Sequence, residues 1–199
     1  MFEKSKKIYF IEGNIGVGKS TNINYITSKN PDIMGLCEPL KNFTLLEKFN
    51  KVYVNNKTYQ KEDPIDYEIQ LETGICSFNQ LMKAKGVVLI ERNPYLRAIV
   101  FSKDKSFTSK QRENIDSANE FMRQILNTIP HETIYLDCPF DEKRRRIIQR
   151  NDVLDESYHK IIEDNYKKYI HNIDYIQINA NRDISEIYND LKSIIKELR

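Results

Sequence analysis

The chain has few cysteines, no long apolar segment and almost no net charge. Cys37, Cys76 and Cys138 are widely spaced, odd in number and not arranged in C-x-x-C pairs, so the sequence supports neither a disulfide framework nor a zinc site. The apolar run nearest the N-terminus, Ile8 to Ile11, is too short for a signal sequence or a membrane span. We therefore expect a protein that stays in the reducing cytoplasm, where it is made.

Charge and metal-ligand patterns exclude further classes of function. The 31 Lys and Arg residues nearly balance the 29 Asp and Glu residues, and a net charge of +2 provides no broad field that would attract nucleic acid or a membrane. His131, His159 and His171 do not have metal-ligand spacing, and no repeat or low-complexity segment occurs. The expected partners are small molecules.

One glycine-rich loop carries the strongest functional signal. The sequence Y-F-I-E-G-N-I-G-V-G-K-S-T starts at residue 9 and places a complete G-x-x-x-x-G-K-S pattern between an apolar strand and a helix, which a chance glycine turn does not explain. Glycines let backbone N–H groups approach phosphate oxygens, Lys19 supplies a positive charge, and Ser20 offers a hydroxyl to Mg2+. The expected ligand is Mg-ATP. Its predicted contacts in the loop are Gly13, Asn14, Ile15, Gly16, Val17, Gly18, Lys19, Ser20 and Thr21.

Apolar runs alternate with amphipathic segments along the chain, which indicates a parallel sheet covered by helices. The predicted strands are Ile8–Ile11, Ile33–Cys37, Gly86–Glu91, Thr133–Cys138 and Tyr175–Ile178. The predicted helices are Lys19–Ser28, Asp63 to about Lys85, Asn93 to about Ser102, Gln111 to about Asn127, Asp141–Arg150, Asp155–Ile170 and Ile184–Leu198, with residues 43–54 helical or irregular. We predict a P-loop NTPase-type α/β fold of three layers, with a five-stranded parallel sheet, in a single domain of residues 1–199.

Three charged residues follow predicted strands and fall near the glycine-rich loop. Ligands bind at the carboxyl ends of the strands in such sheets. Glu91 is a candidate Mg2+ ligand, although a glutamate there could instead cap a helix. Glu38 is a candidate general base for phosphorylating an alcohol, and the alternative is an ordinary turn carboxylate before a proline. Arg92 directly follows Glu91.

A cluster of arginines lies on the helix that begins near residue 141. Such a run is usually a solvated face, but beside a triphosphate Arg146 and Arg150, one helical turn apart, could clamp the transferring phosphoryl group. Arg144 and Arg145 belong to the same cluster. We predict a short lid at about residues 144–156.

These motifs together resemble the cellular and viral deoxyribonucleoside kinases. The resemblance rests on the glycine-rich loop, Glu38-Pro39, Gln70, Glu91-Arg92 followed by Phe101, and the R-I-I-Q-R sequence that ends at Arg150. It extends from about residue 8 to residue 169. Asn93-Pro94 after Glu91-Arg92, in place of the common serine, resembles the viral members, for which the location would be the host cytoplasm.

The resemblance implies roles for individual residues. Glu38 would be the base on the 5′-hydroxyl, Arg92 would hold the same oxygen and the incoming phosphate together with Lys19, and Ser20 and Glu91 would organise Mg2+. Gln70 would read the edge of the base. The implied substrate-binding residues are Ile15, Glu38, Phe43, Tyr53 (with Asn50 as the alternative), Gln70, Arg92, Arg97, Phe101 and Asp155.

The chain departs from the family pattern at several positions. Thr73, Ser77 and Arg97 stand where the family tunes its choice of base, and the combination matches neither the usual pyrimidine set nor the usual purine set. Asp152 stands where a third lid arginine is common, so the clamp differs in composition. The preferred base is therefore open.

The implied activity is transfer of the γ-phosphoryl group of Mg-ATP to a deoxynucleoside in nucleotide salvage, with thymidine or a broad range of nucleosides as acceptor. The resemblance also implies a homodimer and feedback by a deoxynucleoside triphosphate. Three alternatives remain, and the first is a thymidylate-type monophosphate kinase, whose dianionic acceptor Glu38 would repel. The others are a nucleotide-switched binding protein, which the incomplete guanine motif at Asn56-Lys57 disfavours, and a nucleoside-binding protein with a disabled lid.

Overall fold

A computed structural model describes residues 6–39, 64–102, 107–150 and 156–196. Five parallel strands form one sheet in the order β2-β3-β1-β4-β5. The strand that leads into the glycine-rich loop is therefore central, with β3 and β4 on either side. The strands are β1 (Lys7–Glu12), β2 (Ile33–Leu36), β3 (Val87–Glu91), β4 (His131–Asp137) and β5 (Ile176–Asn179).

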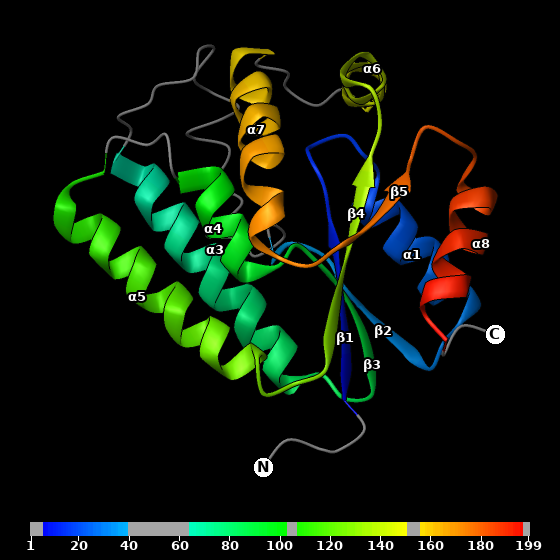
Figure 1. Ribbon diagram of the computed structural model, residues 1–199, viewed down its shortest axis with the longest axis horizontal. Helices are drawn as coiled ribbons and strands as arrows, with labels where there is room; N and C mark the ends of the chain where they lie inside the picture. Colours follow the sequence, from blue (N-terminus) through cyan, green and yellow to red (C-terminus); the bar gives the residue numbers. More distant parts are fainter. Residues whose placement is uncertain (1–5, 40–63, 103–106, 151–155, 197–199) are drawn as a thin grey trace.

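Helices cover both faces of the sheet (Figure 1). Helices α1 and α8 lie on one face, helices α3, α4, α5 and α7 lie on the other, and α6 follows the carboxyl end of β4. The helices are α1 (Lys19–Lys29), α3 (Pro64–Lys83), α4 (Pro94–Ser102), α5 (Ser109–Leu126), α6 (Phe140–Gln149), α7 (Glu156–Tyr169) and α8 (Ile184–Ile194), with the 3-10 turn η3 (Ile170–Asn172) after α7.

The central strand shows why the sheet is apolar on both faces. Successive side chains of a strand point to opposite sides, and here both sides are covered. Tyr9 and Ile11 pack with residues of α1 and α8, whereas Ile8 and Phe10 pack with residues of α3 and α5. All four side chains are fully buried, so a continuous apolar run is what this position requires.

The predicted fold class is confirmed, and the element boundaries differ by a few residues. β2 ends at Leu36, so Glu38 stands just beyond the strand. α5 begins at Ser109 instead of Gln111, because Thr108 accepts a hydrogen bond from the Gln111 backbone and the Gln111 side chain accepts one from Thr108, a capping box that fixes the start. Residues 43–54 lie outside the described residues. No helix in the described part of the chain is long and apolar enough to span a membrane.

Two glycines outside the loop make a matched test of packing. In α3, a Cβ added at Gly74 would meet Met122 Cε at 3.7 Å, an ordinary contact. In β2, a Cβ at Gly35 would lie 2.8 Å from Ile23 Cγ2 and 2.9 Å from Thr27 Cγ2. We expect Gly74→Ala to raise the free energy of unfolding by about 0.5–1 kcal/mol, since alanine loses less entropy in a helix. Gly35→Ala should lower it by about 1–3 kcal/mol through overpacking.

Urea denaturation of both variants beside the unsubstituted protein measures the two changes. Equal effects of the two substitutions, or a destabilising Gly74→Ala, would contradict the packing described for α3 and β2.

Candidate active site

The glycine-rich loop has a backbone that only glycine adopts easily. Gly13, Gly16 and Gly18 have φ values of 138°, 83° and 101°, in a region that other residues rarely occupy. Gly18 stands immediately before α1, so the N-terminal N–H groups of this helix face the loop. A helix start of this kind attracts anions, and the loop therefore has the backbone of a phosphate-binding site.

Close packing holds the loop in this position. A Cβ at Gly13 would collide with the Leu136 carbonyl oxygen of β4, and a Cβ at Gly16 would lie 2.7 Å from the Lys143 carbonyl oxygen of α6. Both neighbours are backbone atoms, which cannot move aside as the end of a side chain can. The glycines are therefore needed for packing as well as for conformation.

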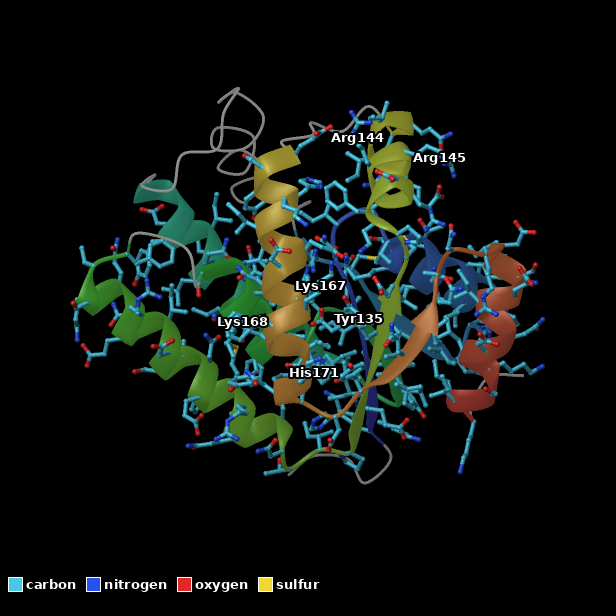
Figure 2. The ribbon with its side chains drawn as sticks, turned by 45° about the horizontal axis from the view of Figure 1, so that its top comes forward. Tyr135, Arg144, Arg145, Lys167, Lys168 and His171 are labelled. Atoms are coloured by element: carbon cyan, nitrogen blue, oxygen red, sulfur yellow. The ribbon has the colours of Figure 1, made fainter. Side chains whose placement is uncertain are left out.

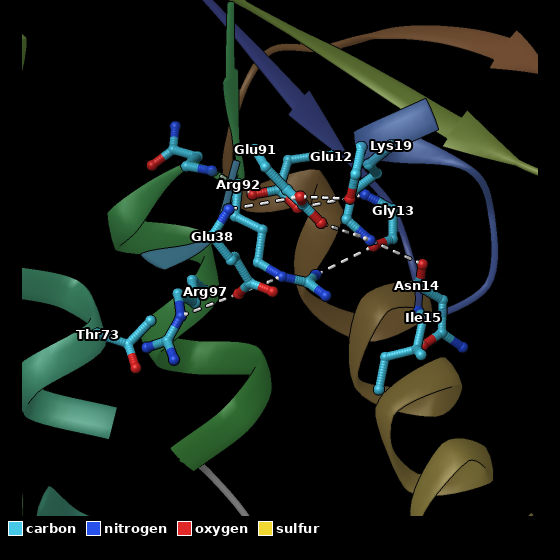
Figure 3. Close-up of polar contacts among 12 residues, drawn as sticks. Glu12, Gly13, Asn14, Ile15, Lys19, Glu38, Thr73, Glu91, Arg92 and Arg97 are labelled. Carbon is cyan, nitrogen blue, oxygen red and sulfur yellow. Dashed lines mark hydrogen bonds and ion pairs between the residues drawn. The ribbon is translucent and has the colours of Figure 1, made fainter. Parts of the chain in front are cut away.

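Lys19 contacts both the loop and the end of β3 (Figure 3), and Ser20 contacts the end of β3. Lys19 Nζ donates to the Asn14 carbonyl oxygen at 3.0 Å and lies 3.7 Å from Glu91 Oε1. Ser20 Oγ donates to Glu91 Oε2 at 2.7 Å. Burial of the ammonium group, followed by repulsion from Arg92, lowers the pKa of Lys19 to about 8. A bound phosphate would oppose both effects.

The pair formed by Ser20 and Glu91 fits a magnesium ion. Hydroxyl and carboxylate oxygens are hard ligands that Mg2+ accepts, and Mg2+ usually keeps waters and substrate phosphates as its other ligands. Among the described residues, no three His, Cys, Asp or Glu side chains gather as an all-protein metal cage. The site therefore suits a metal that arrives with a nucleotide.

Glu38 faces two arginines, Arg92 and Arg97. Glu38 Oε1 accepts a hydrogen bond from Arg92 Nε at 2.7 Å and lies 3.5 Å from Arg97 Nε. Burial by itself raises the pKa of Glu38, but the charges of Arg92 and Arg97 outweigh burial and hold the pKa below its ordinary value. Glu38 is therefore an ionised carboxylate at neutral pH and can accept a proton.

Arg92 is the one non-glycine residue of the described chain that has a positive φ, 71°. Its Nη1 atom donates to the Gly13 carbonyl oxygen at 3.1 Å and to Tyr166 Oη at 2.5 Å. Its guanidinium carbon lies 4.6 Å from the centre of the Phe101 ring. A strained backbone persists where many contacts determine it, and such positions cluster at functional sites.

Buried residues of α3 and α4 lie next to Glu38 and Arg92. Gln70, Thr73 and Ser77 lie at helical spacing on α3 and are all buried, as are Arg97 and Phe101 of α4. Arg97 Nη1 donates to the Gln70 carbonyl oxygen at 3.1 Å. Figure 3 shows the Arg97 guanidinium between Glu38 and Thr73. The structure thus brings together the residues of α3 and α4 that the sequence assigns to the base.

Ile15 of the loop packs against the apolar cluster that contains Phe101. The loop and Phe101 therefore belong to one packed unit. Phe101 also contacts Tyr166 edge to face, with ring centres 6.3 Å apart. This packing fixes the Phe101 ring from two sides.

The arginines of α6 differ in their surroundings. Arg146 is half-buried, donates to the Val17 carbonyl oxygen at 3.0 Å and to the Ala180 carbonyl oxygen at 2.9 Å, and pairs with Glu142 at 2.7 Å. Arg150 is exposed at the end of the helix. Arg144 and Arg145 lie on the outer part of α6 in Figure 2, and each forms an exposed ion pair, with Glu156 and Glu142 respectively.

Part of the predicted site lies outside the described residues. This applies to Phe43, Tyr53 with its alternative Asn50, and Asp155, as well as to Asp152 and the central part of the predicted lid, residues 151–155. The substrate contacts implied for these residues, and the lid, therefore stay predictions.

The structure adds residues that the sequence reasoning missed. Glu12 is fully buried at the end of β1 and contacts Tyr166 of α7. Asn14 and Lys143 both donate to Glu163 Oε2 at 2.7 Å, which ties the loop to α6 and α7. Glu12 carries the same signal as Glu91, a carboxylate that ends an apolar strand, and could have been found. The contacts of α7 with Glu12 and Asn14 span 154 and 149 positions of sequence and have no local signal.

Comparison with known proteins decides the family. The profile of the deoxynucleoside kinases matches residues 9–199. The chain belongs to the deoxynucleoside kinase family. Among solved structures, a deoxyadenosine kinase from M. mycoides, solved with its products dCMP and a flexible dCDP bound, has 20% sequence identity and a TM-score of 0.62. The match covers 94% of this chain and 99% of that chain, and it supports the P-loop kinase fold. No curated protein matches the sequence of this deoxynucleoside kinase.

The pKa of Lys19 gives the family's phosphate site a testable pH dependence. Below about pH 8 the empty protein holds Lys19 protonated, and above about pH 8 the amine is neutral and attracts phosphate less. We expect the Kd of a fluorescent ATP analogue with Mg2+ to be constant up to about pH 7 and then to rise, by up to about tenfold per pH unit above pH 8. Lys19→Met should bind more weakly and without this pH dependence. A constant Kd for the unsubstituted protein up to pH 9.5 would contradict the assignment.

Proposed function

We propose that this protein is an ATP-dependent deoxynucleoside kinase, which transfers the γ-phosphoryl group of Mg-ATP to the 5′-hydroxyl of a deoxynucleoside. The observation that carries the proposal is the contact of 2.7 Å between Glu38 and Arg92 at the sheet edge that also holds the glycine-rich loop. A carboxylate and a guanidinium at this place suit an acceptor hydroxyl and an incoming phosphoryl group. Membership of the family supports the same reaction.

On the donor side, the chain supplies positive charge from three sources. The backbone N–H groups of the loop and the start of α1 bind the phosphate oxygens, Lys19 reaches the β and γ phosphates, and Arg146 with Arg150 approaches from α6. Ser20 and Glu91 would hold Mg2+, which would neutralise charge on the phosphates. The protein thus contributes positioning and charge stabilisation.

On the acceptor side, Glu38 orients the 5′-hydroxyl and accepts its proton as the phosphoryl group arrives. Arg92 holds the same oxygen and the transferring group. The low pKa of Glu38 keeps the carboxylate ready to accept a hydrogen bond, and the charges of Arg92 and Arg97 weaken its basicity. In a loose phosphoryl-transfer transition state, the acceptor hydroxyl keeps its proton until late in the transfer. A weak base at the correct place is therefore sufficient.

Arg97 supports a preference among bases. A guanidinium only donates hydrogen bonds, so it matches a carbonyl oxygen and opposes an amino group. Thymine and guanine have a carbonyl at the edge where cytosine and adenine have an amino group. We therefore propose thymidine and deoxyguanosine as better acceptors than deoxycytidine and deoxyadenosine, within the thymidine or broad specificity that the resemblance implies.

One observation favours a second candidate, a monophosphate kinase of the thymidylate type. Arg92 and Arg97 together carry more positive charge than Glu38 offsets, and this excess could bind an acceptor phosphate. Glu38 lies so close to both arginines that it would repel the same dianion. The two candidates differ in the acceptor they phosphorylate.

We extend the proposal to a homodimer in the cytoplasm that a deoxynucleoside triphosphate inhibits. The exposed apolar side chains of Ile75 on α3 and Phe121 on α5 support a contact surface on these helices. A triphosphate of the product nucleoside would combine the chemistry of both substrates, which supports feedback at the active site. Light scattering and inhibition assays with the four triphosphates test these two extensions.

Removing the proposed base gives the direct test of the reaction. With Mg-ATP, we expect ADP release with at least one of thymidine, deoxyguanosine, deoxycytidine and deoxyadenosine, and little with thymidine monophosphate. Glu38→Gln keeps the shape of the side chain and should lower kcat about a hundredfold or more, since general bases contribute about 10²–10⁴-fold. Glu132→Gln is the matched control, because Glu132 pairs with Lys7 at the other end of β4. Turnover of thymidine monophosphate alone would move the assignment to a monophosphate kinase.

Replacing Arg97 tests the base preference. Arg97→Met should lower kcat/KM for thymidine and deoxyguanosine by about tenfold or more relative to deoxycytidine, because a hydrogen bond to a charged group contributes about 1.5–3 kcal/mol. The ratio between acceptors serves as its own control, since a general loss of activity cancels. An unchanged ratio would show that Arg97 does not select the base.

A further inference from the structure

Glu12 is a buried carboxylate to which the reaction above assigns no role. It is fully buried at the end of β1, directly before the first glycine of the loop. Its Oε2 atom accepts hydrogen bonds from Tyr166 Oη at 2.9 Å and from the Gly13 backbone N–H at 3.3 Å, and its Oε1 atom accepts one from the Asn93 backbone N–H. An acidic group so far from water requires partners of this kind.

Two partners of Glu12 also adjoin or contact Arg92, and the strand that carries Glu12 holds the Arg92 backbone. Asn93 is the residue after Arg92, so the hydrogen bond to its N–H fixes the backbone that leaves the positive-φ residue. Tyr166 Oη donates to Glu12 and accepts from Arg92 Nη1 at 2.5 Å, so one hydroxyl joins the carboxylate to the guanidinium. On the other side, the Arg92 backbone N–H donates to the Ile11 carbonyl oxygen at 3.1 Å.

Burial keeps the Tyr166 hydroxyl protonated at neutral pH. Burial raises the pKa of Tyr166 well above its ordinary value, so its hydroxyl can donate and accept at once. Burial also raises the pKa of Glu12, and the charge of Arg92 opposes that rise. The positive charge of Arg92 thus favours the ionised form of Glu12 across a single phenol.

We propose that Glu12 and Tyr166 are positioning residues that hold Arg92 in its strained backbone conformation with its Nε atom directed at Glu38. Neither residue touches the acceptor, because both are fully buried beneath Arg92. Their effect on the reaction passes through Arg92. A left-handed conformation is unfavourable for a residue with a side chain, and these contacts offset that cost.

The Arg92 Nε–H signal in 15N-labelled protein tests the positioning without any assay of activity. In the unsubstituted protein the buried Nε–H bonded to Glu38 should exchange slowly with water and give a separate signal, assigned by its loss in Arg92→Lys. Tyr166→Phe removes only the hydroxyl and should make this signal exchange rapidly or disappear. Tyr188→Phe is the matched control, because Tyr188 is buried on the other face of the sheet and its hydroxyl contacts Asn30.

Kinetics then test whether the positioning serves the reaction, and this step rests on the proposed function. Tyr166→Phe should lower kcat about tenfold with KM for ATP unchanged within about twofold, as expected for a lost contact with a charged group. Glu12→Gln should change both readouts in the same direction. Arg92, Arg97 and Lys19 all lower the pKa of Glu38. If Arg92 is loosened, only Arg97 and Lys19 still lower it fully, so the pKa of Glu38 rises and the acid limb of kcat/KM should move to higher pH.

The outcomes separate this inference from the proposed function. An Nε–H signal that Tyr166→Phe and Glu12→Gln leave unchanged would overturn the inference. A changed Nε–H signal with an unchanged kcat and pH profile would also overturn it. The same holds if Tyr166→Phe and Tyr188→Phe change the Nε–H signal and kcat equally. A changed signal in a protein that phosphorylates no nucleoside would support the positioning of Arg92 and remove the proposed function.

Discussion

The buried guanidinium of Arg92 is the group on which the rest of the site depends. A buried charge is costly unless partners satisfy it, and the partners of Arg92 come from four parts of the chain: Glu38 after β2, the Gly13 carbonyl of the loop, Tyr166 of α7 and the ring of Phe101 on α4. Satisfying this one charge therefore aligns the donor loop, the acceptor carboxylate and two helices. The strained φ of 71° indicates that these contacts outweigh the preference of the backbone.

Parallel pairing of β1 with β3 brings the charged groups to one edge. Ile11 is level with Glu91 in the register, so Glu12, Glu91 and Arg92 emerge together beside the loop. The carboxylates have different tasks, because their surroundings differ. Glu91 contacts Ser20 and Lys19 near the place of the phosphates, whereas Glu12 is enclosed by backbone N–H groups and a phenol. One sheet edge thus carries both the proposed magnesium ligand and the carboxylate proposed to support Arg92.

Local patterns predicted the fold, and they identified the glycine-rich loop as the candidate phosphate site. The alternation of apolar runs with helical periodicity specifies a parallel sheet, and the spacing of glycines with Lys19 and Ser20 specifies the loop, because these features depend on neighbouring residues. The acceptor side required the family resemblance, which assigned Gln70, Arg97 and Phe101. The roles of Tyr166 and Glu163 could not be predicted, because Glu12 and Arg92, which contact Tyr166, and Asn14, which contacts Glu163, lie between 74 and 154 residues away. A tyrosine or glutamate within an amphipathic helix is also an ordinary surface choice. Arg146 was expected to face the phosphates. The structure shows that it also donates to the Val17 and Ala180 carbonyl oxygens and so ties α6 to the loop. These contacts join distant parts of the chain and have no local signal in the sequence.

The central claim is transfer of a phosphoryl group to a nucleoside hydroxyl, and the fate of labelled oxygen tests it most directly. The protein is incubated with ATP carrying 18O at the γ-phosphoryl oxygens, Mg2+ and thymidine or deoxyguanosine, and the product is analysed by mass spectrometry and 31P NMR. The account predicts a 5′-monophosphate that retains the three non-bridging labelled oxygens and the nucleoside's own 5′-oxygen. Labelled inorganic phosphate released at the same rate without a nucleoside, or a labelled diphosphate formed only from an added monophosphate, would contradict it.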